Sequence, residues 1–228
     1  MIRIKSHIKV IVFDVYGTLY NVHSVVKKCD ELYPGKGKEL SELWRRKQLE
    51  YSFLRQLMGT YEPFHKITKD ALMFSCKALD LPFNEEKTHL LLDAYLHLTL
   101  FEEAEQVLSV LKDKQLAVFS NGSLDMLEPL IKESPLKRMD ITMISVDEGK
   151  VFKPTSMAYQ LVLKKLHVSR EEVLFVSSNT WDIAGAKNFG FNTAWINREE
   201  KVFDHLDVSP DDEYSNLLCL LDEISDPF

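Results

Sequence analysis

Several apolar runs of this sequence are followed directly by side chains that can carry chemistry. The carboxylate of Asp14 comes after residues 8–13, and the ammonium of Lys153 lies in the loop that follows residues 141–146. The full set of these polar residues is Asp14, Ser120, Asn121, Lys153, Ser177, Ser178, Asn179 and Asp182. Taken singly, such residues can start helices or face solvent. Together they supply two carboxylates, an ammonium, hydroxyls and amides, which is a set from which a catalytic site can be built.

Strands that alternate with helices would bring these side chains together. Residues 8–13 are nearly all apolar and rich in Ile and Val, which is typical of a strand buried on both faces. Further strands are expected at residues 116–120, 141–146, 173–178 and 192–196, with helices at 102–113, 123–133, 155–166, 181–189 and 213–224. This alternation predicts an α/β fold, a doubly wound parallel sheet with a Rossmann-like core. The carboxyl ends of its strands would share one edge, where such folds place their sites.

About eighty residues after the first strand have a helical pattern instead. Apolar side chains recur in steps of three and four through residues 39–58 and 67–78, as on one face of a helix. Asn84, followed by two glutamates, has the pattern of an N-cap with acids in the first helical turn. We therefore predict an inserted all-helical cap subdomain at residues 22–98. Residues 1–21 and 99–228 would form the α/β core domain.

The composition limits the binding partners and the cellular location expected for this protein. A net charge of -7 gives no long-range attraction for nucleic acid or acidic membranes, and no run approaches the ~20 apolar residues of a membrane helix. The N-terminus lacks the apolar stretch of a signal peptide. Three cysteines without CxxC spacing indicate reduced thiols in a cytoplasmic protein, and the seven histidines show no zinc-binding spacing.

Four segments resemble the motifs of the haloacid dehalogenase superfamily. They are FDVYGTL at residues 13–19, SNGS at 120–123, KVFKP at 150–154 and SSNTWDIAGAKNFG at 177–190. The segment LWRRKQLEYSFLRQLM at residues 43–58 looks like the cap helix of the L-2-haloacid dehalogenase (type II) branch. This segment and SSNTWD are the more specific parts, because FDxxGT would also fit many phosphatases.

The resemblance implies hydrolysis of short-chain L-2-haloalkanoic acids to D-2-hydroxy acids and halide, with no metal or other cofactor. Asp14 would attack C2 and form an aspartyl ester with inversion, and Asp182 would assist the water that hydrolyses the ester. Lys153 should keep Asp14 ionised, because a nearby cation favours the charged form. Arg45 and Asn121 would receive the departing halide.

The resemblance also implies roles for residues around these groups. Three residues would position the hydrolytic water: Thr18, Ser177 and Asn179. Tyr159 would support Lys153. The substrate carboxylate would be held by Ser120 and by the backbone N–H groups of Val15, Tyr16 and Asn121. An apolar wall against the substrate would consist of Tyr16, Leu49, Phe64 and Trp181, although ordinary core packing also explains such residues. Arg46 departs from relatives with an uncharged polar residue, and it would either alter substrate range or face solvent.

Two other functions compete with dehalogenation. A phosphatase of the same superfamily would need a second Asp two residues after the nucleophile, where this chain has Tyr16. It would also need acidic metal ligands at residues 177–179, which are Ser, Ser and Asn, whereas a hard dication prefers several anionic oxygens. A non-catalytic protein that keeps the fold is disfavoured by the intact polar set. Since dimers are common in the family, a homodimer is a further expectation, for which the apolar face of the cap helix could supply an interface.

Overall fold

The computed structural model describes residues 6–82 and 84–222, and its centre is a six-stranded parallel sheet in the order β5-β4-β1-β6-β7-β8. The strands are β1 (Val10–Phe13), β4 (Gln115–Ser120), β5 (Ile141–Ser145), β6 (Val173–Ser177), β7 (Asn192–Ile196) and β8 (Asp212–Tyr214). β1 pairs with β4 on one side and with β6 on the other, and all 4 of its residues are buried. Burial on both faces explains why its sequence is a continuous apolar run.

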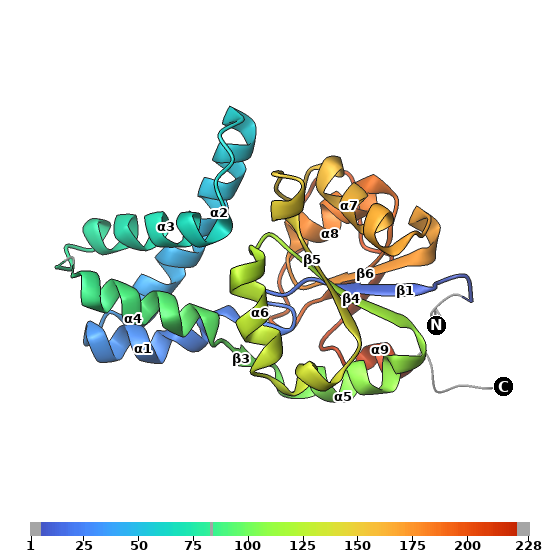
Figure 1. Ribbon diagram of the computed structural model, residues 1–228, viewed down its shortest axis with the longest axis horizontal. Helices are drawn as coiled ribbons and strands as arrows, with labels where there is room; N and C mark the ends of the chain where they lie inside the picture. Colours follow the sequence, from blue (N-terminus) through green and yellow to red (C-terminus); the bar gives the residue numbers. More distant parts are fainter. Residues whose placement is uncertain (1–5, 83, 223–228) are drawn as a thin grey trace.

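Helices cover both faces of the sheet (Figure 1). On one side lie α7 (Ser156–Leu166) and α8 (Thr180–Phe189), and on the other α5 (Glu102–Val110) and α9 (Cys219–Asp222). Helix α6 (Leu124–Lys132) lies between this core and the remaining helices. Short 3-10 helices are η1 (Val22–Val25), η2 (Leu111–Asp113), η3 (Pro135–Arg138), η4 (Val146–Glu148) and η5 (Arg170–Glu172). The predicted doubly wound α/β fold is confirmed.

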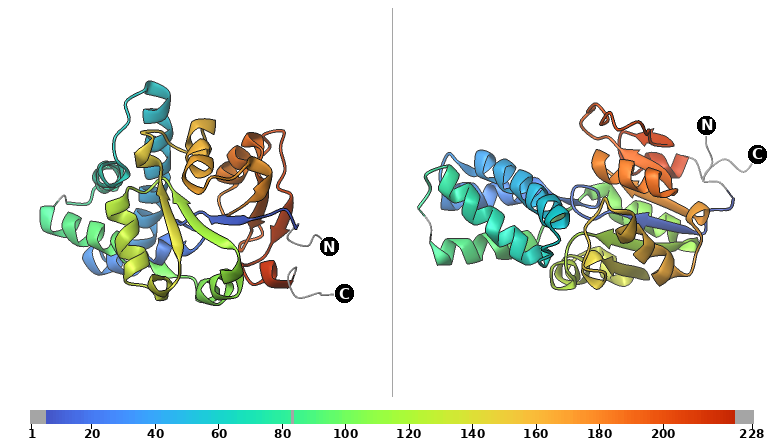
Figure 2. Two further views of the ribbon diagram at one scale, coloured as in Figure 1. Left: turned by 45° about the vertical axis from the view of Figure 1, so that its right-hand side comes forward. Right: turned by 90° about the horizontal axis from the view of Figure 1, so that it is seen from above.

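Four of the helices between β1 and β4 form a separate group beside the carboxyl ends of the strands (Figures 1 and 2). They are α1 (Val26–Leu32), α2 (Gly37–Met58), α3 (Phe64–Ala78) and α4 (Glu85–Leu96). The Asn84 side chain accepts a hydrogen bond from the Lys87 N–H and caps α4, as predicted. Among the helices of the described chain, none combines the length and apolar character needed to cross a membrane.

The chain enters and leaves this helical group through two short strands that pair with each other. β2 (Tyr20–Asn21) and β3 (Thr99–Leu100) are antiparallel, and neither was predicted. Each strand has only 2 residues, so neither has a sequence period that could reveal it. We propose that residues 22–98, which lie between these strands, are the cap.

The helix predicted at residues 213–224 is wrong. Residues 212–214 form β8, which pairs in parallel with β7, and the helix α9 spans only Cys219–Asp222. Asn197 N donates to the Tyr214 carbonyl at 2.7 Å, and Asp211 accepts hydrogen bonds from both the N–H and the hydroxyl of Thr193. These contacts with β7 and its following loop favour an extended chain, which local propensity does not reveal. Residues 223 and 224 lie outside the described residues.

Candidate active site

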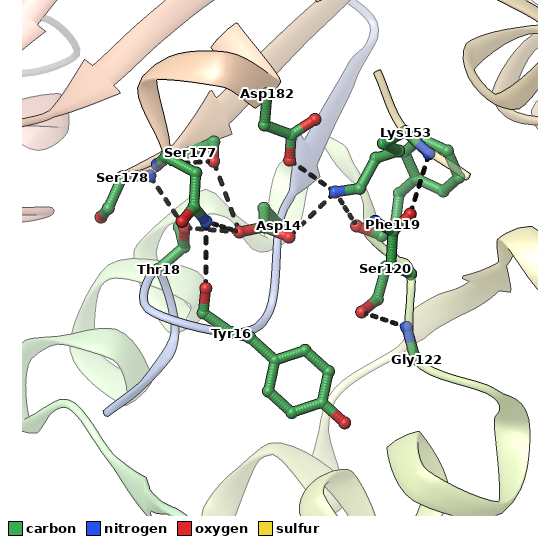
Figure 3. Close-up of polar contacts among 12 residues, drawn as sticks. Asp14, Tyr16, Thr18, Phe119, Ser120, Gly122, Lys153, Ser177, Ser178 and Asp182 are labelled. Atoms are coloured by element: carbon green, nitrogen blue, oxygen red, sulfur yellow. Dashed lines mark hydrogen bonds and ion pairs between the residues drawn. The ribbon is translucent and has the colours of Figure 1, made fainter. Parts of the chain in front are cut away.

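Lys153 joins two carboxylates at the carboxyl ends of the central strands (Figure 3). Its Nζ donates to Asp14 Oδ1 at 2.9 Å, to Asp182 Oδ2 at 2.5 Å and to the Phe119 carbonyl at 3.1 Å, which uses its three N–H groups. The relative exposures of Lys153, Asp14 and Asp182 are 1%, 4% and 0%. Such buried charges are tolerable only when they are paired and hydrogen-bonded. Three segments far apart in the sequence therefore form one ionic cluster.

The second oxygen of Asp14 is held from the opposite side. Asp14 Oδ2 accepts hydrogen bonds from Thr18 Oγ1 at 3.0 Å, Ser177 Oγ at 3.3 Å and Asn179 Nδ2 at 2.8 Å. The Thr18 hydroxyl oxygen itself accepts from the Ser178 N–H at 2.8 Å, so its proton is left to point at Asp14. Gly17, at φ +88°, allows the turn that brings Thr18 back toward Asp14, because side-chain-bearing residues rarely adopt this conformation. These contacts fix the orientation of the Asp14 carboxylate.

Asp182 is held in place by Tyr159. The Tyr159 hydroxyl lies 2.7 Å from Asp182 Oδ1 and 2.9 Å from the Asp182 carbonyl oxygen. Because Asp182 in turn binds Lys153, the predicted support of Lys153 by Tyr159 would act through this carboxylate. Gly185 in α8 permits this approach, because a Cβ at that position would lie 2.5 Å from the Tyr159 hydroxyl and 2.5 Å from the Pro154 ring.

Burial and neighbouring charges shift the pKa values of this cluster. Burial by itself lowers the pKa of Lys153, but the carboxylates of Asp14 and Asp182 outweigh it and raise that pKa above its ordinary value. Burial raises the pKa of Asp182 to about 6, although the Lys153 ammonium opposes this shift. Lys153 is thus a permanent cation near neutral pH, whereas Asp182 changes its charge in an accessible pH range.

A small cavity adjoins this cluster and brings the core and the helical group together. Its lining residues are Asp14, Tyr16, Arg45, Leu49, Phe64, Ser120, Asn121, Lys153, Asn179 and Trp181. Arg45 and Leu49 come from α2 and Phe64 comes from α3. Every predicted substrate-contacting side chain is in this lining, and Val15, predicted to contribute only its backbone N–H, lies in the core. Arg46 is exposed and does not belong to the lining.

Asn121 and Ser120 are oriented to donate hydrogen bonds in this cavity. The Asn121 side-chain oxygen accepts from the Lys153 N–H at 2.9 Å, which turns Nδ2 the other way. Within the described residues this buried Nδ2 has no hydrogen-bond partner, and such an unpaired donor costs about 1–3 kcal/mol. Ser120 Oγ accepts from the Gly122 N–H at 3.0 Å, so its own proton is left to donate. A bound anion would satisfy both donors.

The donor set does not fit a divalent cation. In phosphatases that resemble this fold, magnesium is held by the nucleophile and by the backbone carbonyl two residues later. Here Asn179 Nδ2 donates to both corresponding oxygens, Asp14 Oδ2 at 2.8 Å and the Tyr16 carbonyl at 3.0 Å. The ammonium of Lys153 lies between the two carboxylates. The Tyr16 ring, in the place of the second acid, points away from Asp14 (Figure 3).

Two residues near the site were not predicted from the sequence. Gln48 of α2 contacts Arg45, since Arg45 Nη1 donates to Gln48 Oε1 at 2.6 Å. Arg198, after β7, binds the carbonyls of Gly17 and Thr18, Ser178 Oγ and the Glu103 carboxylate, and so clamps the loop that follows Asp14. Arg198 lies beyond the last segment with a recognisable motif, so no sequence signal indicated it. Gln48 lies inside the cap-helix segment, one turn from Arg45, and this spacing is the signal that could have identified it.

A second, wider cavity adjoins the first. The two share Tyr16, Arg45, Leu49 and Asn179, and the lining of the wider cavity also includes Arg198. Arg45 therefore stands between the small cavity beside Asp14 and this wider space.

Comparisons with known proteins agree with the geometry. The family model described as haloacid dehalogenase-like hydrolase matches residues 8–190. An (S)-2-haloacid dehalogenase of Pseudomonas putida is 47% identical over 214 residues, which are 93% of this chain and 94% of the relative. The solved L-2-haloacid dehalogenase of Xanthobacter autotrophicus has a TM-score of 0.92 and 37% identity, over 97% of this chain and 100% of that one. Its structure with chloropropionic acid covalently bound has a TM-score of 0.91 and 36% identity, with coverage of 97% and 100%.

Proposed function

The chain belongs to the haloacid dehalogenase-like hydrolases, and on this basis we propose that it hydrolyses short-chain L-2-haloalkanoic acids to D-2-hydroxy acids and halide. The observation that carries the proposal is the cavity itself. In it a fixed carboxylate, Asp14, faces the same space as the guanidinium of Arg45, an apolar wall and Asn121 Nδ2, which has no hydrogen-bond partner among the described residues. The covalently bound chloropropionic acid in the Xanthobacter enzyme supports a reaction through an ester.

In the first step, Asp14 attacks C2 from the side opposite the halogen, which forms the C2–O bond, releases halide and inverts C2. Ser120 and the backbone N–H groups of Val15, Tyr16 and Asn121 hold the substrate carboxylate. The hydrogen-bond donors around Asp14 fix the orientation of its carboxylate. A carboxylate fixed in this way reacts as if it were present at a very high concentration, whereas a free carboxylate is a weak nucleophile. Arg45 and Asn121 Nδ2 stabilise the negative charge that develops on the halogen.

In the second step, water attacks the ester carbonyl carbon of Asp14, and the bond from that carbon to the oxygen on C2 breaks, so that the hydroxy acid leaves and the Asp14 carboxylate is regenerated. The water donates one proton to Asp182, which returns it to the departing alkoxide oxygen, and its other proton is released to solvent. Thr18, Ser177 and Asn179 hold the ester carbonyl and the water in position. A pKa of about 6 suits Asp182 to this task, because an acceptor with a pKa near the working pH takes up and returns a proton readily. Lys153 stabilises the charge that moves between the two carboxylates.

A halide-release assay on L- and D-2-chloropropionate tests this function. Only the L enantiomer should react, and chiral analysis should find only the D-hydroxy acid, because one fixed carboxylate approaches C2 from one side. A phosphatase assay in parallel should give no turnover. Retention of configuration or a racemic product would contradict direct displacement by a fixed nucleophile.

Activity should not depend on a divalent cation. The amide of Asn179 and the ammonium of Lys153 donate hydrogen bonds to the oxygen atoms that a divalent cation would need as ligands. After exhaustive dialysis against EDTA, we expect kcat and KM for L-2-chloropropionate to equal those of the untreated enzyme. Loss of activity that added magnesium restores would refute this reading of the site.

The pH profile of kcat should follow Asp182 on its acidic side. Asp182 acts as an ionised group. In the free enzyme, burial and the Asp14 charge raise its pKa to about 6, and the ester lacks that charge, so kcat should fall as the pH decreases below about 6. The pKa of Lys153 is raised, so Lys153 stays charged and kcat should stay level up to pH values above the ordinary ~10 of a lysine. Circular dichroism at each pH would separate this titration from unfolding. A kcat that stays unchanged well below pH 6 would show that the ionised Asp182 is not required.

Two further properties remain predictions for this chain, namely a cytoplasmic location and a homodimeric state. Cys29, Cys76 and Cys219 are free thiols, which agrees with a reducing compartment. Size-exclusion chromatography with light scattering would establish the oligomeric state.

A further inference from the structure

We propose that Gln48 is a positioning residue that holds the guanidinium of Arg45 at the halide end of the cavity, an inference that rests on the proposed function. Gln48 lies three residues after Arg45 in α2 and is fully buried, at 0% exposure. Arg45 Nη1 donates to Gln48 Oε1 at 2.6 Å. This hydrogen bond connects Arg45, a half-buried cation in the cavity lining, to the amide of Gln48 in the interior of the cap.

The orientation of the Gln48 amide is set by Thr68 of α3. The Thr68 hydroxyl donates to the Phe64 carbonyl at 2.8 Å, so its oxygen is left to accept from Gln48 Nε2 at 2.7 Å. If the amide were flipped, its oxygen would face the Thr68 oxygen and its NH₂ would face the N–H of Arg45. The two N–H groups could not bond each other, and the Thr68 hydroxyl could donate to that oxygen only by giving up the Phe64 carbonyl. The Gln48 oxygen must therefore face Arg45.

A second donor, from α4, meets the same oxygen. The Tyr95 hydroxyl donates to Gln48 Oε1 at 2.9 Å, and Tyr95 is itself buried against the rings of Tyr16 and Trp44, with ring centroids 5.8 Å and 5.0 Å away. Burial raises the pKa of Tyr95, so the hydroxyl stays neutral and keeps its proton. Three cap helices thus converge on one amide, and every polar atom of that amide group is engaged. Satisfied buried networks of this kind hold their members rigidly.

The chemistry of the halide step explains why a neutral amide suits this position. The guanidinium of Arg45 has five N–H donors and lies at the end of a long, flexible side chain. A fixed acceptor that binds one of these donors selects a single orientation of the guanidinium. A glutamate would also orient Arg45, but its charge would compete with the halide for the same cation. Gln48 orients the guanidinium without cancelling the charge that the departing halide needs.

The experiment compares the wild-type enzyme with Gln48→Met, Gln48→Glu and Thr68→Val. Measurements are kcat and KM for L-2-chloropropionate and the inhibition constant for added bromide, a halide that would occupy the site of the departing chloride. We expect Gln48→Met to lower kcat by about 10-fold or more, because misplaced groups of this kind cost up to ~10² in rate. We expect Gln48→Glu to lower kcat by about 10-fold or more as well, because its charge competes with the halide for Arg45. Their inhibition constants for bromide should rise, while KM changes less. Thr68→Val, which removes the lock on the amide but leaves Gln48 in place, should shift the same constants in the same direction.

Ser52→Ala is the matched control. Ser52 is buried on α2 one turn after Gln48, and its hydroxyl donates to the Leu49 carbonyl and not to Arg45. The Ser52→Ala variant should leave the inhibition constant for bromide unchanged. A double-mutant cycle adds a readout that a purely structural role would not move: in an Arg45→Lys background, Gln48→Met should cost much less than in the wild type.

The outcomes separate this inference from the proposed function. If the wild-type enzyme releases no halide, the proposed function fails. If it does, and folded Gln48 variants keep the wild-type kcat and bromide constant, the positioning role alone is wrong. If the Gln48 variants do not fold, Thr68→Val decides: an unchanged bromide constant overturns the inference, and a raised one supports it.

Discussion

The Asp14→Asn protein, assayed as purified, should release halide at a rate lower than the wild type by on the order of 10⁴-fold or more, as expected when a nucleophile is removed. A neutral amide is a far weaker nucleophile than a carboxylate, and it lacks the attraction to the Lys153 ammonium 2.9 Å away. Lys153 still has Asp182 as a partner in this variant, so the fold should survive. Asp140→Asn, at an exposed carboxylate outside the cavity lining, is the matched control and should keep full activity.

An isotope experiment then decides how Asp14 acts. In a single turnover in H₂¹⁸O with enzyme in excess, water attacks the ester carbonyl, so the oxygen bonded to C2 comes from Asp14. The first hydroxy acid should therefore carry no label in its new hydroxyl. The label should enter the Asp14 side chain, where mass spectrometry of the peptide detects it, and later turnovers should transfer it to product.

The competing mechanism has Asp14 or Asp182 activate a water that attacks C2 directly. It also inverts C2, so stereochemistry does not distinguish it from the ester route. It would place the label in the product hydroxyl after one turnover and leave the Asp14 peptide unlabelled. That result would remove Asp14 as the nucleophile and leave a general-base mechanism.

Arg45→Lys should lose activity by on the order of 10²-fold or more although the positive charge is kept, by analogy with the loss of one transition-state donor. A guanidinium can bond the Gln48 oxygen with one N–H and present others to the halide. An ammonium is compact, more strongly hydrated and shorter in reach, so it cannot keep the Gln48 contact and still occupy the same place in the cavity. The measurement is kcat for L-2-chloropropionate, together with bromide inhibition.

Arg46 provides the control for this substitution on the same helix. It is the next residue along α2, it is exposed, and it does not line the cavity, so Arg46→Lys should retain near-wild-type kcat. Equal effects at the two positions would mean that the helix needs arginine for a reason unrelated to the halide. A near-wild-type kcat in a folded Arg45→Lys protein would remove Arg45 from the halide site.

The sequence by itself determined the core of this protein and the location of its site. Apolar runs define the buried strands, and parallel connections place their carboxyl ends at one edge. For that reason Asp14 could be predicted to meet Lys153 and Asp182, which follow it by more than a hundred residues, and Lys153 is hydrogen-bonded to both carboxylates. Helical periodicity likewise predicted the long helix that carries Arg45 into the cavity.

The tertiary structure alone decided features that depend on contacts between distant segments. The edge strand β8 forms because β7 offers it backbone partners, whereas its own three residues have no distinctive pattern. The same holds for Arg198, whose role comes from carbonyl groups about 180 residues earlier. Gln48 has a buried partner on each of two other cap helices, and only their packing turns its amide toward Arg45. Residue type and spacing describe what a side chain can bond, but the packing of the chain decides which partner it meets.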